Sequence, residues 1–126
     1  MNPPVRILLA EDDRILRRAG EVTLRRQGYT VVVAVDGEDA LAKAREHKPD
    51  LILLDVIMPK IGGFEVLARL QSDDETRHIP VIMLSNLGQA SDVQHAVARG
   101  ARDYLVKSNI APDQLAARIA AALAKT

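Results

Sequence analysis

Short apolar runs alternate along the chain with longer stretches in which apolar residues recur every three or four positions. Continuously apolar runs rich in Val, Ile and Leu indicate buried strands, whereas the periodic stretches indicate amphipathic helices. The expected strands are residues 5–10, 30–35, 51–55, 81–85 and 103–107. The expected helices are residues 14–27, 36–47, 63–71, 91–100 and 112–125. The pattern therefore predicts five strand–helix units in succession.

Turn and cap residues support these boundaries. Asp36 is a good N-cap for the second helix, Gly28 and Gly100 are expected to end the first and fourth helices, and Pro112 lies near the start of the fifth. Strands that are apolar throughout are typical of a parallel sheet covered by helices on both faces. We therefore expect a doubly wound α/β fold, a five-stranded parallel sheet with five helices, and one domain over residues 1–126 that ends with the fifth helix.

Composition narrows the functional classes. Lys and Arg together number 17, as do Asp and Glu, so nothing in the net charge favours binding to nucleic acid or an anionic membrane. The chain has no cysteine, and therefore no disulfide or thiolate chemistry. No apolar stretch approaches the roughly 18 residues of a membrane span, and the N-terminus lacks the apolar core of a signal peptide. We expect a cytoplasmic protein.

Charged and hydroxyl residues stand where the expected strands end. In a doubly wound sheet, ligands bind at the carboxyl ends of the strands, so these residues should converge on one rim. They are Glu11, Asp12 and Asp13 after the first strand, Asp55 in the third, Ser85 in the fourth and Lys107 in the fifth. Asp36, after the second strand, is sufficiently explained as a helix cap.

Carboxylates gathered at one rim would repel one another, and a cation relieves this repulsion. An all-oxygen ligand set without Cys or His favours Mg²⁺, which shares its remaining coordination positions with water and phosphate oxygens. A carboxylate beside such a metal can accept a phosphoryl group, while Lys107 and the Ser85 hydroxyl could stabilise the phosphoryl oxygens.

Four segments carry a family resemblance: "ILLAEDD", "DLILLDVIMPKIGGFEVL", "IPVIMLSN" and "ARGARDYLVKS". Together they span nearly the whole chain and resemble the receiver domain of two-component response regulators, in particular the single-domain form of the chemotaxis response regulators. The resemblance implies a flavodoxin-like strand order, 2-1-3-4-5.

The resemblance also implies residue roles. Asp55 is expected to be the phosphorylated aspartate and Lys107 the lysine that pairs with the phosphate. Ser85 is expected to be the switch hydroxyl, and Tyr104 the aromatic residue that turns inward once Ser85 has moved. The expected Mg²⁺ ligands are Glu11, through a metal-bound water, Asp12, Asp55 and the backbone carbonyl of Ile57. Asp13 would then cap or flank the first helix.

The implied function is a phosphorylation-controlled signalling switch that is not an enzyme for an external substrate, although it partly catalyses its own phosphorylation. Its phosphoryl donor would be a histidine kinase or a histidine phosphotransfer protein. Its output would be a changed surface on the fourth helix, fifth strand and fifth helix that binds an unknown downstream protein. Dimerisation on phosphorylation is possible in this scheme, and direct contact with nucleic acid or membrane is not expected.

Three positions depart from the family pattern. Ser108 replaces a proline that usually follows the lysine, so the cis or trans state of that peptide is open. Gly62 replaces a common Asp that would cap the third helix, and Asn86 replaces a smaller residue. In addition, Ile57 and Leu87 are both apolar and cannot orient an attacking water, which predicts slow self-dephosphorylation.

The same residues argue against two other functions. A flavin or nucleotide binder would need a glycine- and hydroxyl-rich loop after the first strand, where this chain has "AEDD". An Asp-nucleophile phosphatase would usually carry a second Asp at the position of Ile57. A receiver-like interaction domain that works without phosphorylation is the remaining alternative, which the complete set of reactive residues disfavours.

The remaining charged residues have simpler interpretations. The arginines of the first helix form either a solvated face balanced by acids or a patch that meets the phosphoryl donor. They are Arg14, Arg17, Arg18, Arg25 and Arg26. The three histidines, His47, His78 and His95, are not expected to bind metal.

Overall fold

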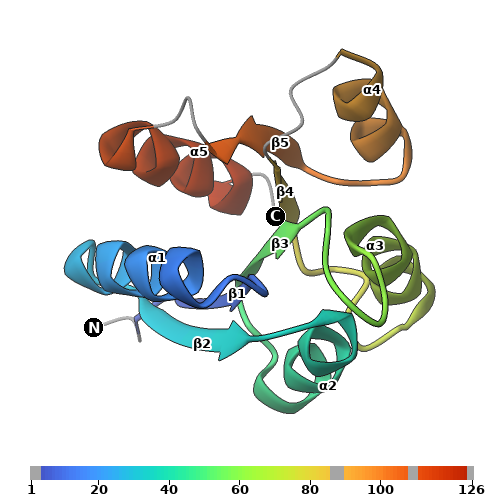
Figure 1. Ribbon diagram of the computed structural model, residues 1–126, viewed down its shortest axis with the longest axis horizontal. Helices are drawn as coiled ribbons and strands as arrows, with labels where there is room; N and C mark the ends of the chain where they lie inside the picture. Colours follow the sequence, from blue (N-terminus) through green and yellow to red (C-terminus); the bar gives the residue numbers. More distant parts are fainter. Residues whose placement is uncertain (1–3, 86–89, 108–110, 125–126) are drawn as a thin grey trace.

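The computed structural model describes residues 4–85, 90–107 and 111–124 (Figure 1). The strands are β1 (Arg6–Ala10), β2 (Thr30–Ala34), β3 (Leu51–Asp55), β4 (Val81–Ser85) and β5 (Asp103–Val106). The helices are α1 (Arg14–Arg26), α2 (Gly37–His47), α3 (Gly63–Ser72), α4 (Ala90–Ala98) and α5 (Pro112–Ala124). All strand pairs are parallel and the order is β2-β1-β3-β4-β5, which confirms the expected fold.

The sheet is apolar on both faces because helices cover both. α1 and α5 lie on one face and α2, α3 and α4 on the other (Figure 1). Along β1, Ile7 and Leu9 join the core beneath α1 and α5, whereas Leu8 and Ala10 join the core on the opposite side. Successive side chains of a strand point to opposite faces, so a strand buried on both sides reads as a continuous apolar run.

Most helix boundaries agree with the expected caps. The Asp36 side chain accepts a hydrogen bond of 2.8 Å from the backbone N–H of Asp39 and so caps α2. Gly28, just past the end of α1, has φ of +95°, a left-handed conformation that glycine adopts without steric cost.

The end of α4 differs from the expectation. The helix stops at Ala98, whereas the sequence predicted that it continues to Gly100. Gly100 has φ of +98° and its N–H donates to the carbonyl of Val97, so it stands beyond the helix rather than in its last turn. A terminal glycine marks the residue that leaves the helix, and the regular turn ends before it.

No helix in the described part of the chain combines the length and the apolar character that crossing a bilayer requires.

Candidate functional site

The candidate site lies at the carboxyl ends of the three central strands. Asp55 is the last residue of β3, which pairs with β1 on one side and β4 on the other. Ala10 is paired with Leu54, so Glu11 emerges from β1 beside Asp55. Both carboxylate residues are buried, with exposed fractions of 4% for Glu11 and 6% for Asp55. Parallel pairing therefore brings together acids that are 44 positions apart in the sequence.

Three carboxylates share this site. Ligand oxygens of Glu11, Asp12 and Asp55 all lie within 4.8 Å of one another, with Asp12 on the exposed side. Among the described residues this is the only group of three or more Asp, Glu, His or Cys side chains with such a spacing. Negative charges this close repel strongly in a partly buried site, and oxygen ligands of this kind suit Mg²⁺. The donor set therefore fits the expected metal.

Lys107 supplies the positive charge within the cluster. Its ammonium donates to Asp55 Oδ2 at 2.9 Å and to Glu11 Oε1. Burial by itself lowers the pKa of Lys107, but the bonds to Glu11 and then to Asp55 outweigh it and raise the pKa above its usual 10.5. Lys107 is therefore charged at neutral pH, and one cation faces three acids.

Asp13 does not join the cluster. Its Oδ1 accepts hydrogen bonds from the N–H groups of Ile15 and Leu16, at 2.9 and 3.0 Å, and so caps α1. Its own N–H donates to Glu11 Oε2 at 3.1 Å. The structure thus separates the three consecutive acids by role, with Glu11 and Asp12 facing Asp55 and Asp13 holding the helix start.

The segment after β3 packs tightly against Asp55. The Ile57 N–H donates to Asp55 Oδ1 at 3.3 Å, while Ile57 as a residue is 63% exposed. A Cβ on Gly63 would lie 2.2 Å from the carbonyl oxygen of Asp55, so α3 starts in direct contact with the backbone of that residue. This role of Gly63 was not predicted from the sequence, although its place directly after Gly62 in "KIGGFE" was a possible signal.

The two expected switch residues are both buried. Ser85 ends β4 and is 1% exposed. Tyr104 lies in β5, pairs with Met83 and is 6% exposed. The resemblance implied that this ring turns inward in response to phosphorylation, whereas the structure already has it among core residues. Ser108, Asn86 and Leu87 lie outside the described residues, as does the Lys107–Ser108 peptide.

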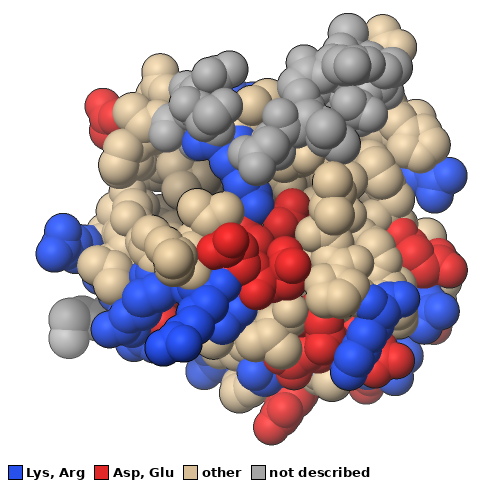
Figure 2. Space-filling view, viewed as in Figure 1, with Lys and Arg blue, Asp and Glu red and all other residues tan. Residues whose placement is uncertain are grey.

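Three of the five arginines of α1 make contacts of two different kinds. Arg18 and Arg25 both pair with Glu21, at 3.2 and 3.0 Å, and so follow the solvated, acid-balanced interpretation. Arg17 instead turns toward the acidic loop, where its Nη1 donates to the carbonyls of Glu11 and Asp12. This contact of Arg17 was not predicted from the sequence, in which Arg17 is one of several similar basic residues. Figure 2 shows the basic side chains over α1 next to the acidic group at the sheet edge.

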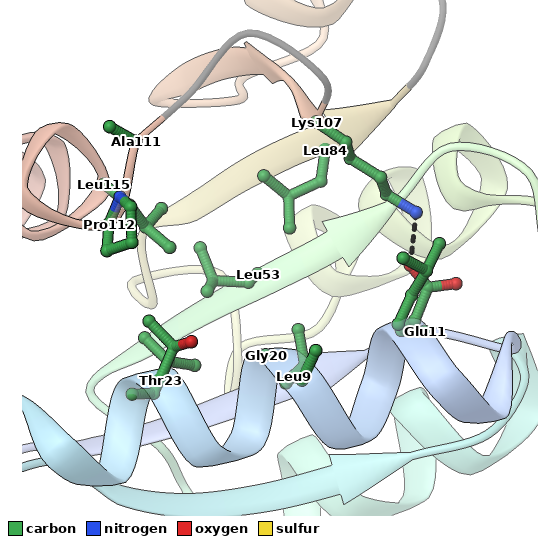
Figure 3. Close-up of a pocket in the computed structure, with 13 residues that line it drawn as sticks. Leu9, Glu11, Gly20, Thr23, Leu53, Leu84, Lys107, Ala111, Pro112 and Leu115 are labelled. Atoms are coloured by element: carbon green, nitrogen blue, oxygen red, sulfur yellow. Dashed lines mark hydrogen bonds and ion pairs between the residues drawn. The ribbon is translucent and has the colours of Figure 1, made fainter.

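An apolar cavity of about 290 Å³ opens between α1 and α5, and the site lies at one end of it. Figure 3 shows Leu53 and Leu84 of the sheet in this cavity, with Leu115 at the far end and the bonded pair Glu11 and Lys107 at the near end. The hydrocarbon stem of Lys107 thus borders apolar space while its ammonium faces the acids.

The histidines described by the structure are not placed as metal ligands. The only metal-type group among the described residues contains none of them. His95 packs edge-on against Phe64, with ring centroids 4.7 Å apart, and so joins α4 to α3.

Comparison with known proteins gives the family. The model of the response regulator receiver domain family matches residues 7–120. The chain is 46% identical over 101 residues to the transcriptional regulatory protein AfsQ1 of Streptomyces coelicolor, and these cover 80% of the chain and 44% of the relative. It is 41% identical to the DNA-binding dual master transcriptional regulator RpaA of Synechocystis, covering 96% of the chain and 50% of the relative. The chain thus spans about half the length of these curated relatives.

Solved structures agree with the sequence matches. A putative response regulator from Chloroflexus aurantiacus superimposes with a TM-score of 0.91 at 33% identity, covering 97% of this chain and 99% of that one. The chemotaxis protein CheY4 of Vibrio cholerae gives 0.88 at 31% identity, covering 95% and 99%. The receiver domain of the sensor histidine kinase PA1611 of Pseudomonas aeruginosa, solved with a magnesium ion in its active-site cleft, gives 0.88 at 26%, covering 97% and 99%. The chain belongs to the receiver domain family of two-component response regulators.

Proposed function

We propose that this domain is a signalling switch in which Asp55 accepts a phosphoryl group. The observation that supports this most directly is the joint position of Asp55, Lys107 and the acids Glu11 and Asp12 at one strand edge. In the transfer, an Asp55 carboxylate oxygen forms a P–O bond as the P–N bond of a donor phosphohistidine breaks. Membership of the receiver family sets the chain apart from conventional enzymes.

Each residue of the site has a defined task in this proposal. Lys107, already in contact with Asp55, would pair with a phosphoryl oxygen, and the Ser85 hydroxyl would donate to another. Glu11, Asp12, Asp55 and the carbonyl of Ile57 would hold Mg²⁺. The metal supplies positive charge that neutralises the phosphoryl oxygens and the crowded carboxylates. Because the transferred group needs mainly positioning and charge, these protein groups together with the metal would meet the needs of the chemistry.

The proposed donor is a histidine kinase or a histidine phosphotransfer protein. We expect it to approach over the start of α1, since Ile15 and Leu16 are 79% and 45% exposed there beside the site. Arg14 and Arg17 stand on either side of this apolar pair in the sequence. Figure 2 shows basic side chains gathered over α1. An apolar anchor with a charged rim is the usual anatomy of a protein-binding surface.

The proposed output is a change on the surface formed by α4, β5 and α5. Lys107 follows β5 directly, so a new bond to phosphate would pull on this strand. Binding of a downstream protein, or dimerisation, would read the change. One matched relative is named as DNA-binding, so the expectation that this chain does not contact nucleic acid stays a prediction. The cytoplasmic location and the extent of the domain over residues 1–126 also stay predictions.

Intact mass spectrometry tests the site directly. The wild type incubated with acetyl phosphate and Mg²⁺ should gain one phosphate, and Asp55→Asn should gain none. Asp13→Asn is the matched control, because Asp13 lies two residues from Glu11 but caps α1, a task that Asn also performs. Phosphate on Asp55→Asn would refute the assignment. A wild type that stays unmodified with both acetyl phosphate and a phosphorylated donor would favour a domain that works without phosphorylation.

A further inference from the structure

We propose that Arg17 is a positioning residue for the acidic site, and that it holds the β1–α1 loop so that Asp12 faces Asp55 and Glu11. This inference rests on the proposed Mg²⁺ site. Its starting observation is that Arg17 Nη1 donates to the carbonyl oxygens of Glu11 and Asp12, at 3.0 and 3.1 Å.

The geometry follows from the place of Arg17 in α1. The helix begins at Arg14, so Arg17 lies one turn inside it. Side chains on a helix tilt toward its N-terminus, which directs this guanidinium back to the loop that precedes the helix. The backbone N–H of Arg17 also donates to Asp13 O at 2.8 Å, so Arg17 bonds to the backbone carbonyls of all three loop acids.

The orientation of the Asp12 carboxylate depends on this contact more than the orientations of the Glu11 and Asp55 carboxylates do. The carboxylate of Glu11 is fixed by Lys107 and by the Asp13 N–H, and that of Asp55 by Lys107 and the Ile57 N–H. Within the described residues, no hydrogen bond or ion pair holds the Asp12 carboxylate. Its direction is therefore set by its own backbone, and Arg17 is the side chain that binds that backbone.

If Arg17 acted only through its positive charge, it would weaken Mg²⁺ binding rather than strengthen it. A guanidinium near a cation site repels the incoming metal, and this repulsion is weak across solvent at physiological salt. Loss of an outer-shell partner typically weakens metal binding by about 10- to 100-fold. The sign of the change on removing Arg17 thus distinguishes positioning, which predicts weaker Mg²⁺ binding, from bare charge, which predicts equal or tighter binding.

Calorimetric titration with Mg²⁺ separates these cases. Arg17→Met keeps the length of the aliphatic stem and should bind Mg²⁺ about tenfold more weakly than the wild type. Arg18→Met is the matched control, because it removes the same charge from the next position, where the guanidinium contacts Glu21 instead. Its Mg²⁺ affinity should equal or slightly exceed that of the wild type.

Each result has one meaning. Equal or tighter binding by Arg17→Met, or equal weakening in both variants, would overturn the inference while leaving the proposed function intact. A wild type that binds no Mg²⁺ would instead overturn the proposed metal site. If Arg17→Met is not folded, Arg17→Lys replaces it in the titration. Lys keeps the charge, but its ammonium ends one atom short of the Nη1 that donates to both carbonyls, so it should still weaken binding.

A measurement without metal tests the loop itself. In metal-free protein, amide hydrogen exchange at Asp13 should speed up in Arg17→Met, because that N–H is bonded to Glu11 across the loop that Arg17 holds. Exchange in the core of β3 should be unchanged. Exchange at Asp13 that matches the wild type in a folded Arg17→Met protein would overturn the inference whatever the metal does.

Discussion

Lys107 shows how one side chain can balance a site that is crowded with acids. Its ammonium bonds to Glu11 and Asp55, which are both nearly inaccessible to solvent, and its own side chain is 17% exposed. A buried charge that has lost its only partner is strongly destabilising. The same lysine therefore supports the fold without phosphate and would be available to the phosphoryl group once Asp55 is modified.

Replacing this lysine should destabilise the domain in a metal-dependent way. Lys107→Met should lower the free energy of unfolding by about 2 kcal/mol at neutral pH, because two buried carboxylates then face each other without a cation. Millimolar Mg²⁺ should recover more stability in the variant than in the wild type. Urea unfolding with and without Mg²⁺ measures both.

Arg77→Met is the control for this prediction. Arg77 pairs with Asp74 at 3.2 Å on the surface, where an ion pair contributes at most about 1 kcal/mol. If the two variants lose equal stability, or if Mg²⁺ stabilises wild type and Lys107→Met alike, the balancing role of Lys107 is wrong.

The start of α3 is an element boundary that the site itself constrains. Gly62 is the N-cap of α3 and makes no side-chain cap bond, and a Cβ there would meet only Val56 O at 3.8 Å. At Gly63, by contrast, a Cβ would overlap the carbonyl oxygen of Asp55. The two adjacent glycines therefore have different structural effects. Gly62 leaves α3 without a side-chain cap, whereas Gly63 allows α3 to approach the backbone of Asp55 closely.

Adding one methyl group at each position should distinguish the two effects. Gly63→Ala should cost about 1–3 kcal/mol of stability and slow phosphorylation, because α3 must move away from the Asp55 backbone. Gly62→Ala should be tolerated at nearly wild-type stability, and Gly62→Asp should gain a few tenths of a kcal/mol by capping α3. Denaturant unfolding and intact-mass time courses report the two effects. Equal tolerance at both glycines would contradict the packing argument.

The start of α2 should respond to acid through Asp36. The backbone N–H of Asp39 holds the pKa of Asp36 below its usual 3.8, an effect that burial opposes and nearby Lys60 reinforces. A carboxylate with a lowered pKa stabilises the fold fully above pH 3.8, and this contribution disappears as the pH falls through its folded value. The ionised Asp36 therefore matters at neutral pH and not in strong acid.

Asp36→Asn isolates that ionic contribution, because Asn keeps the capping oxygen. The wild type should be the more stable protein at neutral pH, and the difference should shrink progressively below pH 3.8. Urea unfolding of both proteins across this range checks it. A difference that stays constant into acid would mean that ionised Asp36 does not stabilise α2.

For the molecule as a whole, the lifetime of the phosphorylated state decides what kind of switch it can be. Ile57 lies two positions after Asp55, and its exposed side chain has no group that could orient an attacking water. Leu87, the second apolar position expected to lack a water-orienting group, lies outside the described residues. We expect self-dephosphorylation over minutes or longer, so that the signal would persist unless another protein removes it.

Intact-mass measurements after removal of acetyl phosphate give this lifetime. Ile57→Asn, which adds an amide able to hold water, should shorten it several-fold, and Ile57→Leu should leave it unchanged. Loss of phosphate within seconds from the wild type would contradict the prediction, as would equal lifetimes in the two variants.

The sequence by itself determined the order of the elements and the chemistry at the strand ends. Five continuously apolar runs could be stable only as strands covered on both faces, and this condition leads to a doubly wound parallel sheet. Acids placed at the ends of such strands must then meet at one edge. Asp55, Glu11, Asp12 and Lys107 were therefore predictable as one group, because pattern and topology together specify their neighbours.

Only the tertiary structure decided contacts that depend on where backbone atoms approach one another. The role of Gly63 follows from the distance between α3 and the carbonyl of Asp55, which no local pattern encodes. The sequence also could not distinguish Arg17 from Arg18, since both are basic residues in the same turn, and their directions relative to the acidic loop separate them. Periodicity and strand ends depend on composition along the chain, whereas these contacts depend on how the packed elements are placed in space.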